Sequence, residues 1–499
     1  MRPVATTRLF INRLLGRAGP ISDDLLAVRR EKLERLRAAG IDPFPHAYPG
    51  VTPIGEVRAA HVGLEPGTDT EAGYRVAGRL HARRGQGKMA FLDLDDRSGR
   101  LQLQAKLDVL GAERMERLIE LDLGDLVGID GVVFMSRRGE LSLRVEDFTV
   151  LAKSLRPPPE KHHGLQDVEL RFRRRELDLI GNPEARELFV TRARIITAVR
   201  RALDDDGFVE VETPVLQPLY GGGMARPFVT HHNVLDRDLY LRIATELYLK
   251  RLIVGGLERV YELGKDFRNE GVSFKHNPEF TVLEWYEAYA DVYDAADRLE
   301  ALVASVARSV GHDDPDVSFT EPWRRTTLAA AILEESGVDI LVNSDRDSLS
   351  AAVGAKLPTT GRNWPQLVDD LLSKFVEPKL QQPTFLFDYP VELSPLAKDH
   401  REHPGMTERF EMFAYGMELA NAFTELNDPD VQRARFDAQV RLAQGGDDET
   451  QPLDEGFLLA LEQGMPPTGG LGLGIDRLVM AMTAKRSIRE VVLFPAMRD

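Results

Sequence analysis

The stretch FRNEGVSFKHNPEFT, residues 267–281, holds the densest cluster of polar side chains in the chain. On a strand, Arg268 and Glu270 lie two residues apart and point to one face, and Glu284 and Tyr286 share a face if the strand continues. An arginine suits bidentate recognition of a phosphate or a carboxylate, and a nearby glutamate orients an amine or a metal ion. A surface strand with incidental charges has the same spacing, so this stretch alone leaves both interpretations open.

A second polar cluster lies between residues 411 and 425. Asn421, Phe423 and Glu425 alternate as on a strand, which would line one side with an amide, an aromatic ring and a carboxylate. Glu411, Glu418 and Glu425 are also spaced by seven residues, which fits one stripe of a solvated helix equally well. Carboxylates gathered at one site bind Mg²⁺ through oxygen, particularly where phosphates complete the coordination shell.

A third candidate is the glycine-rich stretch GGLGLGIDR, residues 469–477. Glycines let a backbone approach a ligand closely, and a following helix presents its positive N-terminus. The spacing is not the GxGxxG fingerprint of dinucleotide-binding folds, and the chain has no P-loop at Gly87-Lys88, because Met89 replaces the required Ser or Thr. Taken alone, this stretch fits a flexible loop as well as a ligand site.

The composition excludes several classes of protein. Over 499 residues, 43% are hydrophobic and 29% are charged, which excludes collagen-like and wholly disordered chains. With no cysteine there is no disulfide framework, thiolate zinc site or cysteine nucleophile. No uncharged apolar run approaches the ~18 residues of a membrane span. The net charge of −16 argues against a nucleic-acid binder, but it is uneven: +3 over residues 1–180 and −19 over residues 181–499.

The pattern along the chain predicts an α+β protein. Five short β-type runs between Tyr74 and Leu151, with one helical insert before the fourth, suggest a small OB-type barrel, although a β-domain without a ligand fits equally. Strands and helices without a regular βαβ rhythm follow. The expected divisions are a basic leader at 1–20, a helix and loop at 21–72, the barrel at 73–153, a proline-containing linker at 154–180, and a second domain at 181–499 with a helical insertion at about 313–379.

The leader contains four arginines and no carboxylate. This composition fits a frayed basic segment or, as the alternative, an organellar transit segment. An apolar h-region is missing, so no secretory signal is recognised. We expect a cytoplasmic protein, with organellar import through residues 1–20 as the alternative.

The three stretches together resemble the signature motifs of the class II aminoacyl-tRNA synthetases. The first motif matches EVETP (210–214), the second FRNE (267–270) and the third GIDR (474–477). The flanking text is similar to that of the lysyl-tRNA synthetases in GGGMARPFVTHHN (221–233), ELYLKRLIVGGLERVYELGKDFRNEG (246–271), HNPEFT (276–281), ELNDP (425–429) and LFPAMR (493–498). The resemblance runs from about residue 25 to the C-terminus.

This resemblance implies an OB-fold anticodon-binding domain and a catalytic domain on an antiparallel six-stranded sheet, which dimerises through the first motif around Pro214. It also implies a two-step reaction. L-lysine and ATP give lysyl-adenylate and pyrophosphate, and the lysyl group then passes to the 3′-terminal adenosine of lysine tRNA.

The resemblance also implies roles for individual residues. For ATP these are Arg268, Glu270, His276, Phe280 and Arg477, with Arg268 also on the substrate carboxylate and both arginines catalytic. Glu411 and Glu418 would hold Mg²⁺, with two or three ions per site. Gly222 and Glu246 would bind the α-ammonium of lysine. The residues that would bind its ε-ammonium and form the surrounding pocket are Glu284, Tyr286, Asn421, Phe423 and Glu425. For the anticodon they are Arg83, Phe91 and Gln102, with Phe91 as barrel core the alternative.

Some positions depart from the family pattern. Thr245 stands where a proline usually precedes Glu246, Trp285 replaces a smaller residue, and Tyr415 and Met417 replace a glycine and an arginine. We expect most of these to touch the pocket walls and to affect amino-acid selectivity.

Three rival interpretations remain. An aspartyl- or asparaginyl-type enzyme would not build its pocket around Glu284 and Glu425. The short paralogue that lysylates elongation factor P lacks the anticodon domain and has alanine at the position of Gly472. A non-catalytic RNA-binding or regulatory relative is disfavoured by the intact Arg268 and Arg477.

Overall fold

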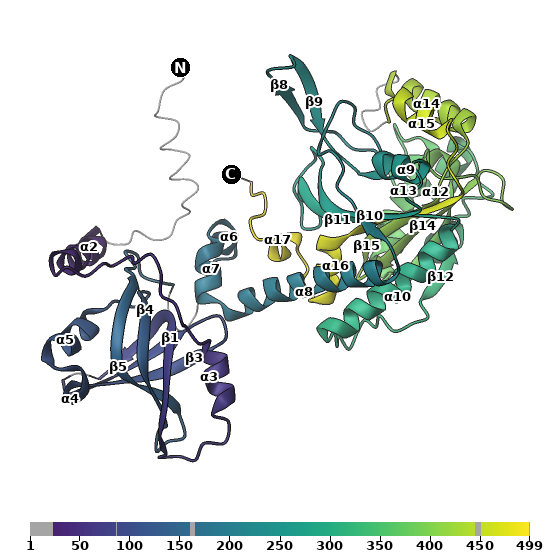
Figure 1. Ribbon diagram of the computed structural model, residues 1–499. Helices are drawn as coiled ribbons and strands as arrows, with labels where there is room; N and C mark the ends of the chain where they lie inside the picture. Colours follow the sequence, from purple (N-terminus) through teal and green to yellow (C-terminus); the bar gives the residue numbers. More distant parts are fainter. Residues whose placement is uncertain (1–22, 86, 160–164, 445–450, 499) are drawn as a thin grey trace. The chain divides into compact units, whose positions relative to one another are not determined.

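The computed structural model describes residues 23–85, 87–159, 165–444 and 451–498 (Figure 1). They divide into two units, Met1–Pro183 and Glu184–Asp499. The basic leader predicted at residues 1–20 lies outside the described residues.

The N-terminal unit is built on a closed barrel with the strand order β1-β2-β3-β5-β4. Side chains that alternate along the strands, among them Leu92, Leu94, Leu101 and Leu103, are at most 1% exposed and fill its interior. Two short helices come between β3 and β4, as the sequence predicts, and the OB-fold prediction is confirmed. The elements are β1 (Asp69–Arg84), β2 (Met89–Asp95), β3 (Arg100–Lys106), α4 (Leu107–Leu110), α5 (Ala112–Glu120), β4 (Leu126–Met135) and β5 (Leu141–Ala152).

Among its described residues, this unit holds four further helices: α2 (Asp23–Ala38), α3 (Ile54–Ala60), α6 (Val168–Arg173) and α7 (Arg175–Gly181). Charged side chains attach α2 to the barrel. Lys32 contacts Asp122 at 2.6 Å, and the buried Lys153 contacts Asp125 at 2.9 Å and also pairs with Asp122. Because Lys32 and Lys153 share one carboxylate, the helix and strand β5 are joined by a single charge network.

The C-terminal unit contains an eight-stranded sheet with the order β12-β13-β14-β15-β16-β11-β10-β6. Its six inner strands pair antiparallel, as expected, whereas the short edge strands β12 and β6 pair parallel with their neighbours. The sheet is therefore mixed and two strands wider than the expected antiparallel sheet. The strands are β6 (Val209–Glu210), β10 (Arg259–Phe267), β11 (Glu279–Ala288), β12 (Arg324–Thr327), β13 (Thr384–Pro390), β14 (Met406–Ala414), β15 (Met417–Thr424) and β16 (Thr468–Gly474).

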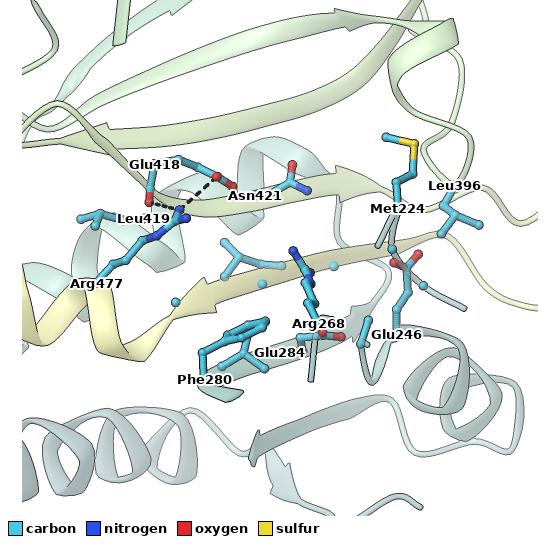
Figure 2. Close-up of a pocket in the computed structure, with 18 of the residues that line it drawn as sticks. Met224, Glu246, Arg268, Phe280, Glu284, Leu396, Glu418, Leu419, Asn421 and Arg477 are labelled. Atoms are coloured by element: carbon cyan, nitrogen blue, oxygen red, sulfur yellow. Dashed lines mark hydrogen bonds and ion pairs between the residues drawn. The ribbon is translucent and has the colours of Figure 1, made fainter. Parts of the chain in front are cut away.

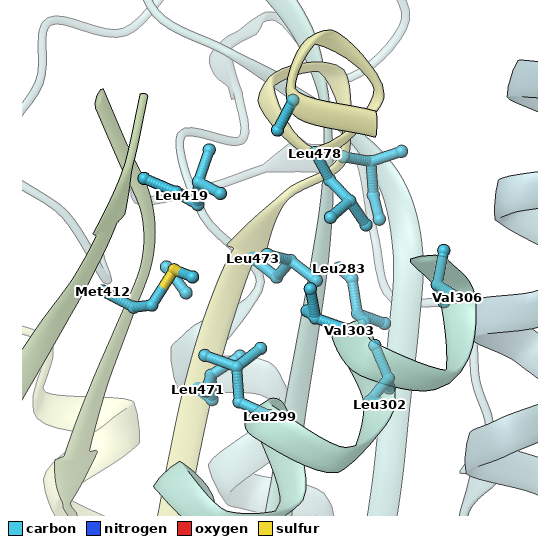
Figure 3. Close-up of a cluster of buried hydrophobic side chains, with 14 of the residues drawn as sticks. Leu283, Leu299, Leu302, Val303, Val306, Met412, Leu419, Leu471, Leu473 and Leu478 are labelled. Atoms are coloured by element: carbon cyan, nitrogen blue, oxygen red, sulfur yellow. The ribbon is translucent and has the colours of Figure 1, made fainter. Parts of the chain in front are cut away.

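One face of this sheet is covered by hydrophobic side chains of α10 (Val292–Val310), α8 (Pro183–Asp205) and α16 (Ile475–Met482). Figure 3 shows Leu299 and Val303 of α10 packed toward Leu471 and Leu473 of β16. All four side chains are at most 1% exposed. Burial of this face leaves the opposite face to polar residues, because successive side chains of a strand alternate between faces.

The remaining elements surround the sheet. A small three-stranded sheet has the order β7-β9-β8. Residues 313–379 hold mainly helices, which pack around a hydrophobic cluster of their own. The elements are β7 (Leu216–Gln217), β8 (Val229–His232), β9 (Arg237–Leu241), α9 (Glu246–Val254), α11 (Leu328–Ser336), α12 (Arg346–Val353), α13 (Trp364–Leu371), α14 (Pro429–Gln444), α15 (Glu455–Leu461) and α17 (Ile488–Val491). Among the described residues, no helix combines the length and the apolar character that crossing a membrane requires.

The core assignment predicts a specific loss of stability. Leu299 is 0% exposed, so Leu299→Ala should lower the free energy of unfolding by about 2–5 kcal/mol, because it leaves a cavity in a close-packed core. The matched control Leu341→Ala changes a leucine that is 61% exposed and should shift stability by no more than about 0.5 kcal/mol. Urea unfolding followed by circular dichroism measures both. Equal losses would contradict the packing of α10 on the sheet.

Candidate active site

A cavity of about 420 Å³ opens on the polar face of the eight-stranded sheet. Figure 2 shows Arg268, Phe280 and Glu284 on one side of it and Glu418 and Asn421 on the other. Most of the residues predicted from the sequence line this one cavity, namely Gly222, Glu246, Arg268, Glu270, His276, Phe280, Glu284, Tyr286, Glu418, Asn421, Phe423, Glu425 and Arg477.

Strand β16 forms the floor of the cavity because its residues on this face are glycines, which have no side chains to fill the space. Gly472 pairs with Glu284 of β11 on one side and with Asn421 of β15 on the other. The alternate residues Leu471 and Leu473 point into the hydrophobic core. The glycine-rich stretch is therefore a central strand that leads into α16, not a flexible loop.

Arg268 follows directly after β10 and extends into the middle of the cavity (Figure 2). Its guanidinium carbon lies 5.1 Å from the centre of the Phe280 ring, a cation–π distance. Its Nε is buried and has no hydrogen-bond partner among the described residues. An unsatisfied buried donor is costly, so this atom is suited to an anionic ligand.

Arg477 lies in the first turn of α16. It contacts both Glu418, which is predicted to bind a metal ion, and His276, which is predicted to bind ATP. It donates to the carbonyl oxygen of Glu418 at 2.7 Å and to its carboxylate at 3.1 Å (Figure 2). Its other terminal nitrogen lies 3.4 Å from Nε2 of His276. Burial lowers the pKa of His276, and the charges of Arg477 and Lys275 lower it further. His276 is therefore neutral near pH 7.

The cluster at residues 411–425 belongs to two strands, which excludes the helical alternative. Glu411 lies on β14, Glu418 on β15, and Glu425 directly after β15. Glu411 is held by Tyr389, whose hydroxyl donates at 3.0 Å, and by an ion pair with Arg409. Burial raises the pKa of Glu411 to about 7; Arg409 opposes this shift, and Glu418 adds to it.

Glu411 and Glu418 are the predicted candidates to hold a divalent cation, and of the two only Glu418 lines the cavity. Glu418 lines the cavity and its side chain is 39% exposed, so its oxygens are accessible to a ligand. Glu411 feels the negative charge of Glu418, which is the like-charge arrangement that a cation between them would relieve. Oxygen donors of this kind suit Mg²⁺ when phosphate oxygens complete the shell.

Three buried carboxylates stand at the other end of the cavity: Glu246 at the start of α9, Glu284 on β11 and Glu425. Lys250, one helical turn after Glu246, contacts Glu246 at 2.6 Å and also pairs with Glu425. Its side chain is fully buried. Burial alone would lower the pKa of Lys250, but the two carboxylates more than offset this and raise it.

Glu284 differs from the other two carboxylates because no lysine, arginine or histidine of the described chain forms an ion pair with it. Within the described part of the chain, it accepts hydrogen bonds from the backbone N–H of Thr245, at 3.3 Å, and from the hydroxyl of Tyr286, at 3.5 Å. Burial raises the pKa of Glu284 to about 8; the charges of Asp266 and Glu246 add to this shift, and Thr245 opposes it. A ligand ammonium group would supply the missing cation.

Two glycines make room for these carboxylates. Gly222 has a φ of +82°, and a Cβ on it would lie 2.9 Å from the Cβ of Glu246. A Cβ on Gly470 would collide with the carboxylate of Glu425 and the ring of Tyr286. A larger residue at either position would displace a side chain of the cavity.

The expectation that most family departures touch the pocket walls is wrong. Trp285 points to the hydrophobic core, because Glu284 and Tyr286 on either side of it point to the cavity. Met417 is also part of the hydrophobic core, and the hydroxyl of Tyr415 donates to Asp314 at 2.9 Å. Only Thr245 contacts a cavity carboxylate, through the N–H that a proline would lack.

On the barrel, Phe91 and Gln102 lie on the outer surface. Leu92 points inward, so Phe91 points outward and is only partly buried, which excludes the barrel-core alternative. Gln102 accepts from Arg84 at 3.4 Å, and Arg84 pairs across the strands with Phe91. The structure thus brings Phe91 and Gln102 together with Arg84. Arg83 instead donates to the carbonyl oxygen of Leu121 at 2.7 Å.

Sequence reasoning missed two residues that organise the cavity. Arg409 stacks on Tyr389 at 4.4 Å and donates to Asn421 at 3.0 Å, and it precedes Glu411 by two residues, so strand parity could have identified it. Lys250 follows Glu246 by four residues, a spacing that places both on one helix face.

Comparison with known proteins agrees with this arrangement. A family model for class II tRNA synthetases (D, K and N) matches residues 167–498, and one for an OB-fold nucleic acid binding domain matches residues 74–151. Proteins named lysine–tRNA ligase are similar over nearly the whole chain. That of Moorella thermoacetica is 52% identical over 95% of this chain and 98% of its own, and that of Syntrophomonas wolfei is 50% identical over 95% and 97%. The chain belongs to the lysine–tRNA ligase family of the class II tRNA synthetases.

Proposed function

We propose that this protein ligates L-lysine to lysine tRNA in two steps. Lysine and ATP give lysyl-adenylate and pyrophosphate, and the lysyl group then moves to the 3′-terminal adenosine of the tRNA. The observation that carries this proposal is Glu284, a buried carboxylate without a cationic partner among the described residues, at the far end of a cavity that also holds Arg268 and Arg477.

In the first step, Arg268 would bridge the carboxylate of lysine and the α-phosphate of ATP, where negative charge develops. Its unpaired, buried Nε supports this role. Phe280 would stack on adenine, His276 and Glu270 would assist in binding ATP, and Arg477 would hold the γ-phosphate. Positioning and electrostatic stabilisation can supply the rate of such an in-line displacement, so no side chain needs to act as a general base.

Glu411 and Glu418 would hold Mg²⁺, two or three ions per site, with phosphate oxygens as further ligands. The bound ions would neutralise negative charge on the phosphates. The chain's own contribution is to keep both carboxylates in place through their ion pairs with Arg409 and Arg477.

At the other end, Gly222 and Glu246 would receive the α-ammonium of lysine, and Glu284, Tyr286 and Glu425 its ε-ammonium. Asn421 and Phe423 would shape the pocket walls. An uncharged isostere of lysine would leave Glu284 buried and unpaired, which disfavours its binding. An aspartyl- or asparaginyl-type substrate would add negative or neutral groups against these carboxylates.

The OB-fold barrel would bind the anticodon, with Phe91 stacking on a base and Gln102 hydrogen-bonding to its edge. Arg84 lies on the same surface as Phe91 and Gln102. It therefore fits the role of the arginine that contacts the anticodon better than the predicted Arg83 does. Presence of this domain also disfavours the short paralogue that modifies elongation factor P.

A homodimer through the first motif around Pro214 would cover the exposed apolar side chains that flank it. Val209, Val215 and Leu216 are 50%, 39% and 47% exposed. We propose the cytoplasm as the site of action.

Activation of lysine is tested by ATP–pyrophosphate exchange. Exchange should depend on lysine, and Arg268→Ala should reduce its kcat at least about 10²–10³-fold, because one donor to the developing charge is lost. Arg259→Ala is the matched control, since Arg259 begins β10, the strand that Arg268 directly follows, and pairs with Glu287 outside the cavity. Exchange with another amino acid but not lysine would contradict the proposed specificity. No exchange at all would favour a non-catalytic relative.

The environment of Glu284 predicts a pH dependence for lysine binding. With a pKa of about 8, the free carboxyl is mostly protonated at pH 7, whereas an ammonium ligand requires the ionised form. The KM for lysine should therefore fall as pH rises from 6 to 8, by up to about tenfold per unit. Glu284→Gln should raise the KM and flatten this profile. A profile of unchanged steepness in Glu284→Gln would refute the assignment.

The barrel surface predicts a defect confined to tRNA. Phe91→Ala should raise the KM for lysine tRNA about 5- to 150-fold, because one base–aromatic stack is lost, and should leave ATP–pyrophosphate exchange unchanged. Phe44→Ala is the control, since Phe44 is 45% exposed elsewhere in the same unit. If both variants charge tRNA like the unmodified protein, the anticodon does not bind through Phe91.

A further inference from the structure

Lys250 is a buried charge to which the proposed reaction gives no role. Its side chain is 0% exposed, and it is not among the residues that line the cavity. Its ammonium lies between Glu246, at 2.6 Å, and Glu425. A charge without a partner is too costly to bury, so the lysine and its two carboxylates must be understood together.

The carboxylates around Lys250 divide into two kinds. Glu246 and Glu425 share its ammonium group. Glu284 has no ion pair with any described residue, and it faces the N–H of Thr245, the hydroxyl of Tyr286 and the negative charges of Asp266 and Glu246. Asp266 in turn pairs with Arg242 at 3.1 Å. Lys250 therefore compensates one pair of carboxylates and leaves the third uncompensated.

The resulting charge matches a dibasic ligand. Glu246, Glu284 and Glu425 contribute three negative charges when ionised, and Lys250 contributes one positive charge. The net charge of −2 is equal in size and opposite in sign to the charge of the two ammonium groups of lysine. Without Lys250, the three buried carboxylates would repel one another, and like charges at one site raise each other's proton affinity.

Resting on the proposed function, we propose that Lys250 is a positioning residue for lysine: its ammonium group holds the carboxylates of Glu246 and Glu425 in place at the end of the cavity before lysine binds. Lys250 acts through these carboxylates and does not touch the substrate. Its removal would leave two buried carboxylates without the cation that they share, and the ammonium groups of lysine would then meet a site that is no longer held in position.

The test compares Lys250→Gln with the unmodified protein. The glutamine side chain of Lys250→Gln remains polar but carries no charge. We expect the KM for lysine in ATP–pyrophosphate exchange to rise about 30-fold or more, the effect of breaking a buried charged pair, while the KM for ATP stays unchanged.

Two further variants separate positioning from mere packing. Lys250→Arg keeps the charge and should recover most of the affinity for lysine that Lys250→Gln loses. Arg251→Met removes an ion pair with Asp454 from the same helix, outside the cavity, and should not change the KM for lysine. Thermal unfolding confirms that each variant is folded at the assay temperature. If Lys250→Gln does not fold, Lys250→Met, which fills the same space without polar atoms, is measured instead.

The inference is overturned if the folded, uncharged variant keeps the KM for lysine of the unmodified protein. It is also overturned if Lys250→Arg raises the KM for lysine as much as Lys250→Gln does. Failure of the proposed function looks different, because then the unmodified protein itself shows no lysine-dependent exchange.

Discussion

The cavity depends on the absence of side chains along one face of a single central strand. Strand β16 lies between β11 and β15, and Gly470 and Gly472 leave open the space above it. On its other face, Leu471 and Leu473 join the hydrophobic core. The period of two in a strand thus assigns one set of residues to stability and the other to a ligand. Polar side chains from both neighbouring strands can then approach the same small volume.

This arrangement sets carboxylates directly above a hydrocarbon core, where water cannot screen them. Their charges are compensated from inside the protein in two ways. Lys250 pairs with Glu246 and Glu425, and Arg409 pairs with Glu411. Where compensation is missing, a ligand has to provide it. The distribution of cations among the carboxylates therefore decides which part of the cavity attracts a positively charged group and which part attracts phosphates with their metal ions.

The sequence predicted the class of fold and gathered most of the cavity residues, because strand parity and ordered motifs are local signals. The structure was needed wherever two distant segments meet. The seven-residue spacing of Glu411 and Glu418 fitted a helix until the hairpin of β14 and β15 was seen. The sequence does not identify Lys250 as a buried charge, since its second partner, Glu425, lies 175 residues away along the chain. Trp285 is one of the departures that we expect mostly at the pocket walls, but parity with Glu284 directs it to the core.

The glycines of β16 also differ in how much space each leaves for a side chain, and therefore in which substitutions each position tolerates. A methyl group at Gly470 would strike Glu425 and Tyr286, so this position is closed to variation as long as both remain. A methyl group at Gly472 would have no neighbour closer than the 3.8 Å that separates it from Glu284, which is ordinary contact. One added carbon there would shorten the cavity without straining the backbone. The same scaffold could thus acquire a preference for a different amino acid by a single small step.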